Sequence, residues 1–154
     1  MRLGSPKPAS SSVCSAMATY LLDTNHASRL LDPTHSLWDR IEAAVEDGHE
    51  ILVSPGVVAE VQFGVEATGD PALRRRRDEA LTTVLGQLGV CPLSLPAARL
   101  AGQLRGRLRR QGLQLDAVDA HLAAIALMEG MVLVTSDRDF APLAGDLVTE
   151  DWLD

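Results

Sequence analysis

The stretch YLLDTN, residues 20–25, changes character at a single residue. Apolar residues typical of a buried strand run into Asp23, and a Thr-Asn pair of the kind found at helix starts follows directly. A strand that continues into a helix in this way is typical of β-α units in a parallel sheet. The acidic residue at the junction raises the question of what a carboxylate would bind at the end of a buried strand.

Short apolar runs alternate with longer amphipathic runs along the rest of the chain. The apolar runs predict strands at 20–23, 51–54, 90–93, 131–135 and 146–149. The amphipathic runs predict helices near 25–31, 34–47, 55–68, 71–88, 95–111 and 117–129, with a short turn near 138–143. This alternation indicates an α/β fold in which helices cover both faces of a parallel sheet.

Three of the predicted helices carry recognisable end signals. Ser54-Pro55 and Asp70-Pro71 each place a capping side chain before a proline in the first helical turn. Asp116 is placed to cap the helix at 117–129, and Gly130 is placed to end it.

Length and composition indicate one domain with an aliphatic core. The chain has 154 residues, of which 46% are hydrophobic but only 3% aromatic, so Leu, Val, Ile and Ala must fill the core. Residues 1–16 lack the apolar segment of an export signal, so we predict a disordered tail there and a single domain at 17–154. Met1 and Met17 are both candidate translation starts. Without an export signal or an apolar run long enough to span a membrane, the expected location is the cytoplasm.

The chain is acidic overall, and its basic residues gather in two runs. The net charge of −7, from 21 acidic and 14 basic residues, argues against a general nucleic-acid coat. Four arginines at 74–77 wrap around more than one helix face and are expected to be solvated. The second run comprises Arg99, Arg105, Arg107, Arg109 and Arg110. For its last four arginines, solvent exposure and contact with phosphate groups of RNA both stay open.

Four acidic residues have access to the sheet edge at which the predicted strands end. Open parallel sheets bind their ligands beyond the carboxyl ends of the strands. Asp119 also falls on an apolar, small-residue face of its helix, where an ionised carboxylate is costly unless something pairs with it. The four residues are Asp23, Glu60, Asp119 and Asp137.

Carboxylates that converge at one edge require a counter-charge. Two like charges about 4 Å apart repel by roughly 4 kcal/mol at an effective dielectric near 20. Lys7 is the only lysine in the sequence and belongs to the predicted tail, so a metal ion is the economical partner. Oxygen ligands favour Mg²⁺ or Mn²⁺ over Zn²⁺, and such an ion activates water and stabilises charge on a phosphoryl oxygen. The sequence therefore predicts hydrolysis of a phosphodiester, with one or two ions.

Each of these residues also has a plain structural explanation. Taken alone, Asp23 is a turn former, Glu60 a solvated helix residue and Asp137 a cap of a short helix. The four histidines show no ligand spacing and are expected at the surface or in caps. Convergence of the four acids on one edge is what favours a function. Residues expected to cap helices, to support the acids or to substitute for one of them are Thr24, Asn25, Asp116, Thr135 and Asp139.

Four segments, taken in order, resemble the motifs of the PIN-domain ribonucleases and, among them, the VapC toxins of toxin–antitoxin pairs. They are YLLDTN, VSPGVVAEVQFGV, DAVDAHLAAIALMEG and LVTSDRDF, and the resemblance runs from about Thr19 to Trp152. It implies a three-layer α/β/α fold with a five-stranded parallel sheet and an endoribonuclease site that depends on Mg²⁺ or Mn²⁺. It also implies a homodimer and a small antitoxin protein that blocks the site.

The same resemblance assigns roles to residues of this chain. It makes Asp23, Glu60, Asp119 and Asp137 the metal-binding and catalytic acids, and it allows Asp139 to exchange roles with Asp137. His26 departs from the pattern, because an apolar or small residue is common after the Asp-Thr-Asn motif. The resemblance selects neither an RNA target nor a cleavage site.

Two alternatives belong to other classes of protein. A catalytically silent binding module would keep the fold and have its acids neutralised by arginines of a partner. A phosphatase of the haloacid dehalogenase type would need a second Asp where Asn25 stands and a core lysine, so we set it aside. Glycine fingerprints of P-loop or dinucleotide sites follow none of the predicted strands.

Overall fold

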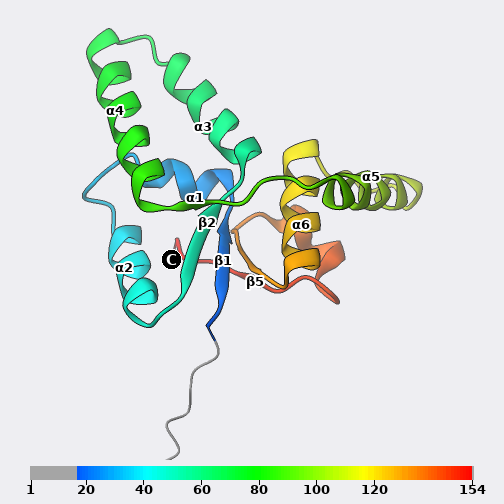
Figure 1. Ribbon diagram of the computed structural model, residues 1–154. Coiled ribbons are helices and arrows are strands. Elements are labelled where there is room, and N and C mark those ends of the chain that lie inside the picture. Colours follow the sequence, from blue (N-terminus) through cyan, green and yellow to red (C-terminus); the bar gives the residue numbers. More distant parts are fainter. Residues whose placement is uncertain (1–16, 154) are drawn as a thin grey trace, which may run out of the picture.

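A computed structural model describes residues 17–153 of the chain (Figure 1). The predicted tail at 1–16 lies outside the described residues. Five strands form one sheet in which every neighbouring pair is parallel, in the order β3-β2-β1-β4-β5. The predicted α/β fold with a five-stranded parallel sheet is confirmed. The strands are β1 (Thr19–Leu22), β2 (Glu50–Val53), β3 (Gly89–Val90), β4 (Val132–Val134) and β5 (Thr149–Glu150).

Helices pack on both sides of this sheet and complete three layers. Figure 1 shows α2 and α4 on one side, α5 and α6 on the other, and α3 and α4 joined as a hairpin. A short 3₁₀ helix, η1, follows β4. The helical elements are α1 (Thr24–Arg29), α2 (Leu37–Glu46), α3 (Pro55–Glu66), α4 (Pro71–Gln87), α5 (Leu95–Arg110), α6 (Ala117–Glu129) and η1 (Arg138–Leu143).

The core is aliphatic and centred on β1 and α6. Leu21 and Leu22 of β1 are fully buried between the neighbouring strands β2 and β4. Ala120, Ala123 and Ala124 of α6 are also fully buried, and their small side chains let this helix approach its neighbours closely. Full burial of one leucine contributes roughly 1.5–3 kcal/mol, so the innermost strand and this helix hold the C-terminal half against the N-terminal half.

The predicted helix ends are confirmed by their capping geometry. Ser54 Oγ accepts a hydrogen bond from Val57 N at 3.2 Å, and Asp70 Oδ1 accepts one from Ala72 N at 3.0 Å. Asp116 Oδ1 accepts one from Asp119 N at 2.8 Å. Gly130 ends α6 with a left-handed backbone (φ 65°) that residues with a Cβ rarely adopt.

The two edge strands are shorter than predicted, and their bounds differ from the predicted ones. The strand predicted at 90–93 is Gly89–Val90, because Pro92 has no N–H to donate and pairing ends with Cys91 N on Val53 O at 2.8 Å. The strand predicted at 146–149 is Thr149–Glu150. The first residues of the predicted strand lie outside β5. Instead, Leu147 N donates a hydrogen bond to Leu143 O at 2.8 Å and closes the turn after η1.

The strand order places a change of direction beside β1. The chain moves from β1 to β2 and β3 on one side, then crosses to β4 and β5 on the other. Connections therefore leave the carboxyl ends of β1 and β4 in opposite directions, and such a switch point is where open parallel sheets bind ligands. Asp23 N donates to Val134 O at 3.0 Å and ties these two strand ends together.

A membrane-spanning helix is absent from residues 17–153, since none of the helices there is both long enough and apolar enough to cross a bilayer.

Candidate active site

All four predicted acids line one cavity at the carboxyl ends of β1 and β4. The cavity has a volume of about 430 Å³. Its acids come from separate elements, since Asp23 ends β1, Glu60 belongs to α3, Asp119 to α6, and Asp137 precedes η1. The remaining lining residues are Thr24, Asn25, Asp116, Ala117 and Val118.

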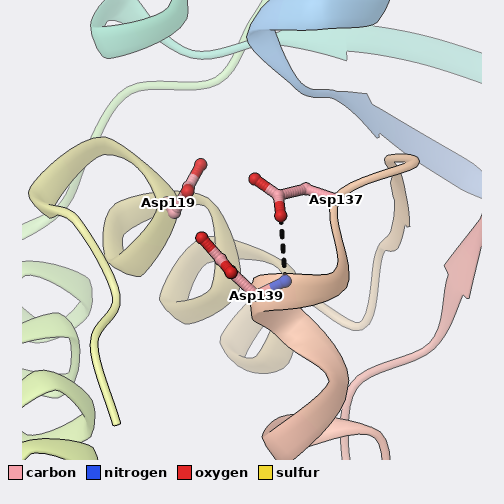
Figure 2. A group of neighbouring side chains, drawn as sticks. All are labelled: Asp119, Asp137 and Asp139. Carbon is pink, nitrogen blue, oxygen red and sulfur yellow. Dashed lines mark hydrogen bonds between the residues drawn. The ribbon is translucent and has the colours of Figure 1, made fainter.

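Three aspartates in this region bring their carboxylate oxygens close together. Asp119, Asp137 and Asp139 each offer an oxygen within 4.8 Å of the other two (Figure 2). Asp137 caps η1 by accepting a hydrogen bond from Asp139 N at 2.9 Å, which holds the two neighbours in a fixed relation. Asp137 is half-buried and lines the cavity, whereas Asp139 is exposed and joins the group from outside the cavity wall. Asp137 and Asp139 both lie close to Asp119, so either one is a candidate for the fourth acid of the site beside Asp23, Glu60 and Asp119.

Within this group, Asp119 has a strongly raised pKa. Burial and the negative charges of Asp116, Asp137, Asp23 and Asp139 raise the pKa of Asp119 from 3.8 to about 7. Arginine gives no relief, because none lies within salt-bridge distance of Asp119, Asp137 or Asp139 in the part of the chain that the structure describes. A carboxyl with this pKa in a cavity of like charges is a candidate for a functional role.

Asp23 lies deeper than the other acids and is held at both oxygens. It is only 4% exposed. Its Oδ1 accepts a hydrogen bond from His26 N at 2.8 Å and lies 2.8 Å from His26 Nδ1, and its Oδ2 accepts one from Thr135 Oγ1 at 2.7 Å. These donors offset the cost of burying a carboxylate. The Thr135 hydroxyl also accepts from Asp137 N at 3.0 Å, so one side chain connects two of the acids.

Glu60 lines the cavity from α3 and is exposed. It also lines a larger cleft of about 880 Å³ that α1, α3 and α4 form. Thr24 is shared by the cleft and the acidic cavity as well, so the two spaces adjoin. The far part of the cleft is apolar around Val61, Val65 and Leu73. Arg29, Arg76 and Arg77 also line it.

The basic residues of α5 are not equivalent. Arg105 Nε donates a hydrogen bond to Leu115 O at 3.0 Å, which fastens α5 to the loop that ends at Asp116. The side chains of Arg107, Arg109 and Arg110 are exposed in the last turns of the helix. Arg105 thus has a structural contact, and contact with phosphate groups stays a prediction for all four.

His26 was expected at the surface or in a cap, and this prediction is wrong in that the side chain is fully buried. Besides its contact with Asp23, His26 Nε2 accepts a hydrogen bond from Trp152 N at 3.1 Å. The partner stands 126 positions away in the chain, so no local pattern reveals the pair. The only sequence signal is the spacing of three residues between Asp23 and His26, which places the imidazole over the capping carboxylate.

The donor set suits a hard divalent cation. Every charged side chain in the cavity wall is a carboxylate, and the oxygens of Asp119, Asp137 and Asp139 are close enough for one ion to bridge them. All-oxygen sets favour Mg²⁺ or Mn²⁺ over softer metals. A cation would also offset the burial and the neighbouring negative charges that together raise the pKa of Asp119. The residues present therefore fit such an ion.

Comparison with known proteins identifies the family. The sequence profile of the PIN domain matches residues 20–146. The chain therefore belongs to the PIN-domain family. Among curated relatives, Ribonuclease VapC2 of Rickettsia felis is 26% identical over 134 residues, which are 86% of this chain and 97% of that protein. Ribonuclease VapC5 of Mycobacterium tuberculosis is 30% identical over 104 residues, 68% of this chain and 75% of the relative.

Solved structures agree with this assignment. The chain is similar to one in the crystal structure of VapBC2 from Rickettsia felis bound to a promoter DNA fragment, with a TM-score of 0.76 and 26% identity over 87% of this chain and 98% of that chain. It is also similar to a chain of VapBC-5 from Mycobacterium tuberculosis, described as a member of the VapBC family of toxin–antitoxin systems. There the TM-score is 0.63 and the identity 25%, over 87% of this chain and 97% of that chain.

Proposed function

We propose that this chain is an endoribonuclease that depends on Mg²⁺ or Mn²⁺ and serves as the toxin of a toxin–antitoxin pair. The observation that carries the proposal is the convergence of four carboxylates from separate elements in one cavity at the switch point of the sheet. Membership of the PIN-domain family and relatives that are named ribonucleases support the choice of RNA as substrate.

The acids of the site differ in burial, and we assign their roles accordingly. Asp119 and Asp137, together with Asp23, would hold the cation, and Asp139 would take the place of Asp137 or support it from outside. When bound there, the ion would supply Lewis-acid stabilisation of charge on the phosphoryl oxygens. Glu60, an exposed acid of the cavity lining, would complete the coordination of the cation directly or through water.

Exposed arginines of α5 are candidate contacts for substrate phosphates. The bond from Arg105 to Leu115 O sets the last turns of α5 against the loop that leads to Asp116. Arg107, Arg109 and Arg110 project from those turns as exposed cations. They would bind backbone phosphates, which adds affinity without reading sequence.

A small antitoxin protein is the proposed partner, and two chains of this protein would form a homodimer. The antitoxin part of the proposal rests on relatives that occur in VapBC complexes and on the cleft beside the site, whereas the homodimer rests on the resemblance to VapC toxins alone. Since the cleft and the acidic cavity share Thr24 and Glu60, a segment that fills the cleft would contact Glu60 at the border of the acidic cavity. A cytoplasmic location, where RNA is available, belongs to the same proposal.

Cleavage of RNA by the full chain tests the function. The purified protein, freed of any partner, is expected to cut a mixed RNA pool with Mg²⁺ or Mn²⁺ and to lose this activity in EDTA. Asp119→Asn should lose it as well, because the substitution removes one carboxylate from the cation site and leaves the side-chain shape nearly unchanged. Undiminished cleavage in a folded Asp119→Asn protein would overturn the proposal. Binding of an antitoxin without cleavage or Mn²⁺ binding would favour the silent binding module.

A further inference from the structure

His26 is a fully buried imidazole with a partner at each ring nitrogen. Its Nδ1 lies 2.8 Å from Asp23 Oδ1, and its Nε2 accepts the backbone N–H of Trp152 at 3.1 Å. One of these partners is an acid of the cavity, and the other belongs to the segment after β5. The ring therefore stands between the site and a part of the chain that does not line it.

The contacts determine which nitrogen carries the proton. An imidazole nitrogen that accepts a hydrogen bond holds a lone pair, and the other nitrogen of a neutral ring then bears the hydrogen. Since the Trp152 N–H points at Nε2, the hydrogen is on Nδ1 and is donated to Asp23 Oδ1. Asp151 Oδ1 lies farther from Nε2, at 3.4 Å, and already accepts a hydrogen bond from Leu153 N at 3.0 Å.

Trp152 is held in place by contacts that do not involve His26. Its indole N–H donates to Glu150 Oε2 at 2.7 Å. Its ring lies 4.8 Å from the ring of Tyr20, and the Arg40 guanidinium lies 5.1 Å from its centroid. A guanidinium at this distance is attracted to the negative face of the indole. The Trp152 amide is thus a fixed donor, and the imidazole has to orient toward it.

Counting the lone pairs of Asp23 shows what this arrangement leaves open. Each carboxylate oxygen has two lone pairs. Oδ1 uses both, because it accepts from His26 N and from His26 Nδ1. Oδ2 accepts only from Thr135 Oγ1 among the described residues and keeps one lone pair. Oδ2 is therefore the atom of Asp23 that remains able to bind a cation.

We propose that His26 is a positioning residue for Asp23 and that the backbone N–H of Trp152 selects its Nδ1–H tautomer, so that Oδ2 of Asp23 is presented to the cation. The inference rests on the proposed function, and it gives the segment after β5 a role in orienting a residue of the site. Loss of a hydrogen bond that orients a metal ligand typically costs about 10- to 100-fold in metal affinity or activity.

The tautomer is tested first, on the wild-type full chain without metal. Long-range ¹H–¹⁵N spectra of histidine-labelled protein at neutral pH are expected to show one ring with a protonated Nδ1 and an unprotonated Nε2. Conversion of this signal by Trp152→Pro, which has no N–H to donate, would assign it to His26. A His26 ring with its hydrogen on Nε2, or on both nitrogens, overturns the proposal even when no variant folds.

Mn²⁺ affinity, measured by the electron paramagnetic resonance signal of free Mn²⁺, tests the positioning role. His26→Leu fills the space without a donor and should weaken binding by about 10- to 100-fold. His26→Asn keeps an amide N–H near the place of Nδ1 and should recover most of the affinity. His49→Leu is the matched control, because His49 Nδ1 accepts a backbone N–H from Ala18 at 3.0 Å but lines no part of the acidic cavity.

The outcomes separate this inference from the proposed function. Wild-type affinity in a folded His26→Leu protein, or equal losses in the Leu and Asn variants, overturns the positioning role while leaving the nuclease proposal intact. Failure of the wild-type chain to bind Mn²⁺ or to cleave RNA overturns the nuclease proposal. In that case the ring spectra alone decide whether Trp152 sets the tautomer of His26.

Discussion

The hydroxyl of Thr135 donates a 2.7 Å hydrogen bond to Asp23 Oδ2 and joins the ends of β4 and β1 across 112 positions of sequence. The Thr135 hydroxyl oxygen in turn accepts a hydrogen bond from Asp137 N at 3.0 Å. One buried hydroxyl therefore orients the deepest acid of the cavity and the start of the turn that carries two more. Loss of this hydroxyl would therefore remove a hydrogen-bond partner from both Asp23 and Asp137.

Replacement of Thr135 by Val should destabilise the fold. The variant keeps the shape but leaves Asp23 Oδ2 without its donor, and an unsatisfied buried polar group costs about 1–3 kcal/mol. Urea denaturation of the metal-free protein measures the loss. Thr135→Ser, which retains the hydroxyl, is the control and should lie closer to wild type. Equal stability of the Val variant and wild type would show that the bond contributes nothing.

The raised pKa of Asp119 predicts how stability depends on pH. Between its ordinary value of 3.8 and about 7, the folded chain keeps a proton that the unfolded chain has released. The contribution of this residue to the free energy of unfolding therefore falls as pH rises through that window and levels off above it. Asp119→Asn, in EDTA, should gain stability relative to wild type from about pH 4 to about pH 8 in urea titrations. Parallel curves for the two proteins would contradict the assignment.

Mn²⁺ should stabilise the wild-type chain against heat. At about 100 times the dissociation constant, a bound ligand adds roughly 2.7 kcal/mol, which corresponds to roughly 5–10 °C in Tm for a chain of this size. Differential scanning calorimetry with and without MnCl₂ measures the shift. Asp119→Asn should show little of it, and an equal shift in this variant would place the ion elsewhere.

Asp137 and Asp139 should differ in their effect on cleavage. Asp137 is half-buried and lines the cavity, whereas Asp139 is exposed and outside its wall. We expect Asp137→Asn to lower kcat by at least ten times more than Asp139→Asn, with both proteins equally folded by circular dichroism. The reverse order would assign the fourth position to Asp139.

Neutralising the exposed arginines of α5 should weaken RNA binding without affecting the fold. A triple Gln variant at Arg107, Arg109 and Arg110 removes cations that form no salt bridge with other residues of the range 17–153. For every arginine that binds a phosphate, its replacement should flatten the slope of log K against log salt by about one unit. Arg75→Gln, an exposed arginine of α4, serves as control. An unchanged slope in the triple variant would remove α5 from the interface.

Local signals in the sequence predict the framework because the physics behind them is local. Ser54, Asp70 and Asp116 cap their helices through hydrogen bonds to residues two or three positions ahead, which a spacing rule captures. The convergence of the acids also follows from the sequence, because carboxyl ends of parallel strands meet at one edge. The ends of the edge strands do not, since competing turns and prolines set them.

The environment of Asp23 is the part that the sequence could not provide. Its donors include Thr135, and its neighbour His26 depends on Trp152, so the arrangement is decided by tertiary contacts across more than one hundred positions. A histidine three residues after a capping aspartate is equally compatible with a solvated ring. Only the packing of the segment after β5 distinguishes the two.

The order of the strands along the chain determines when the site can form during synthesis. The ribosome makes β1 early, but β4, Thr135 and Asp137 emerge more than one hundred residues later. A nascent chain that carries Asp23 and Glu60 alone lacks β4 beside β1, and it also lacks Asp119 and Asp137 of the cavity lining. The complete site can therefore form only after nearly the whole chain has been translated.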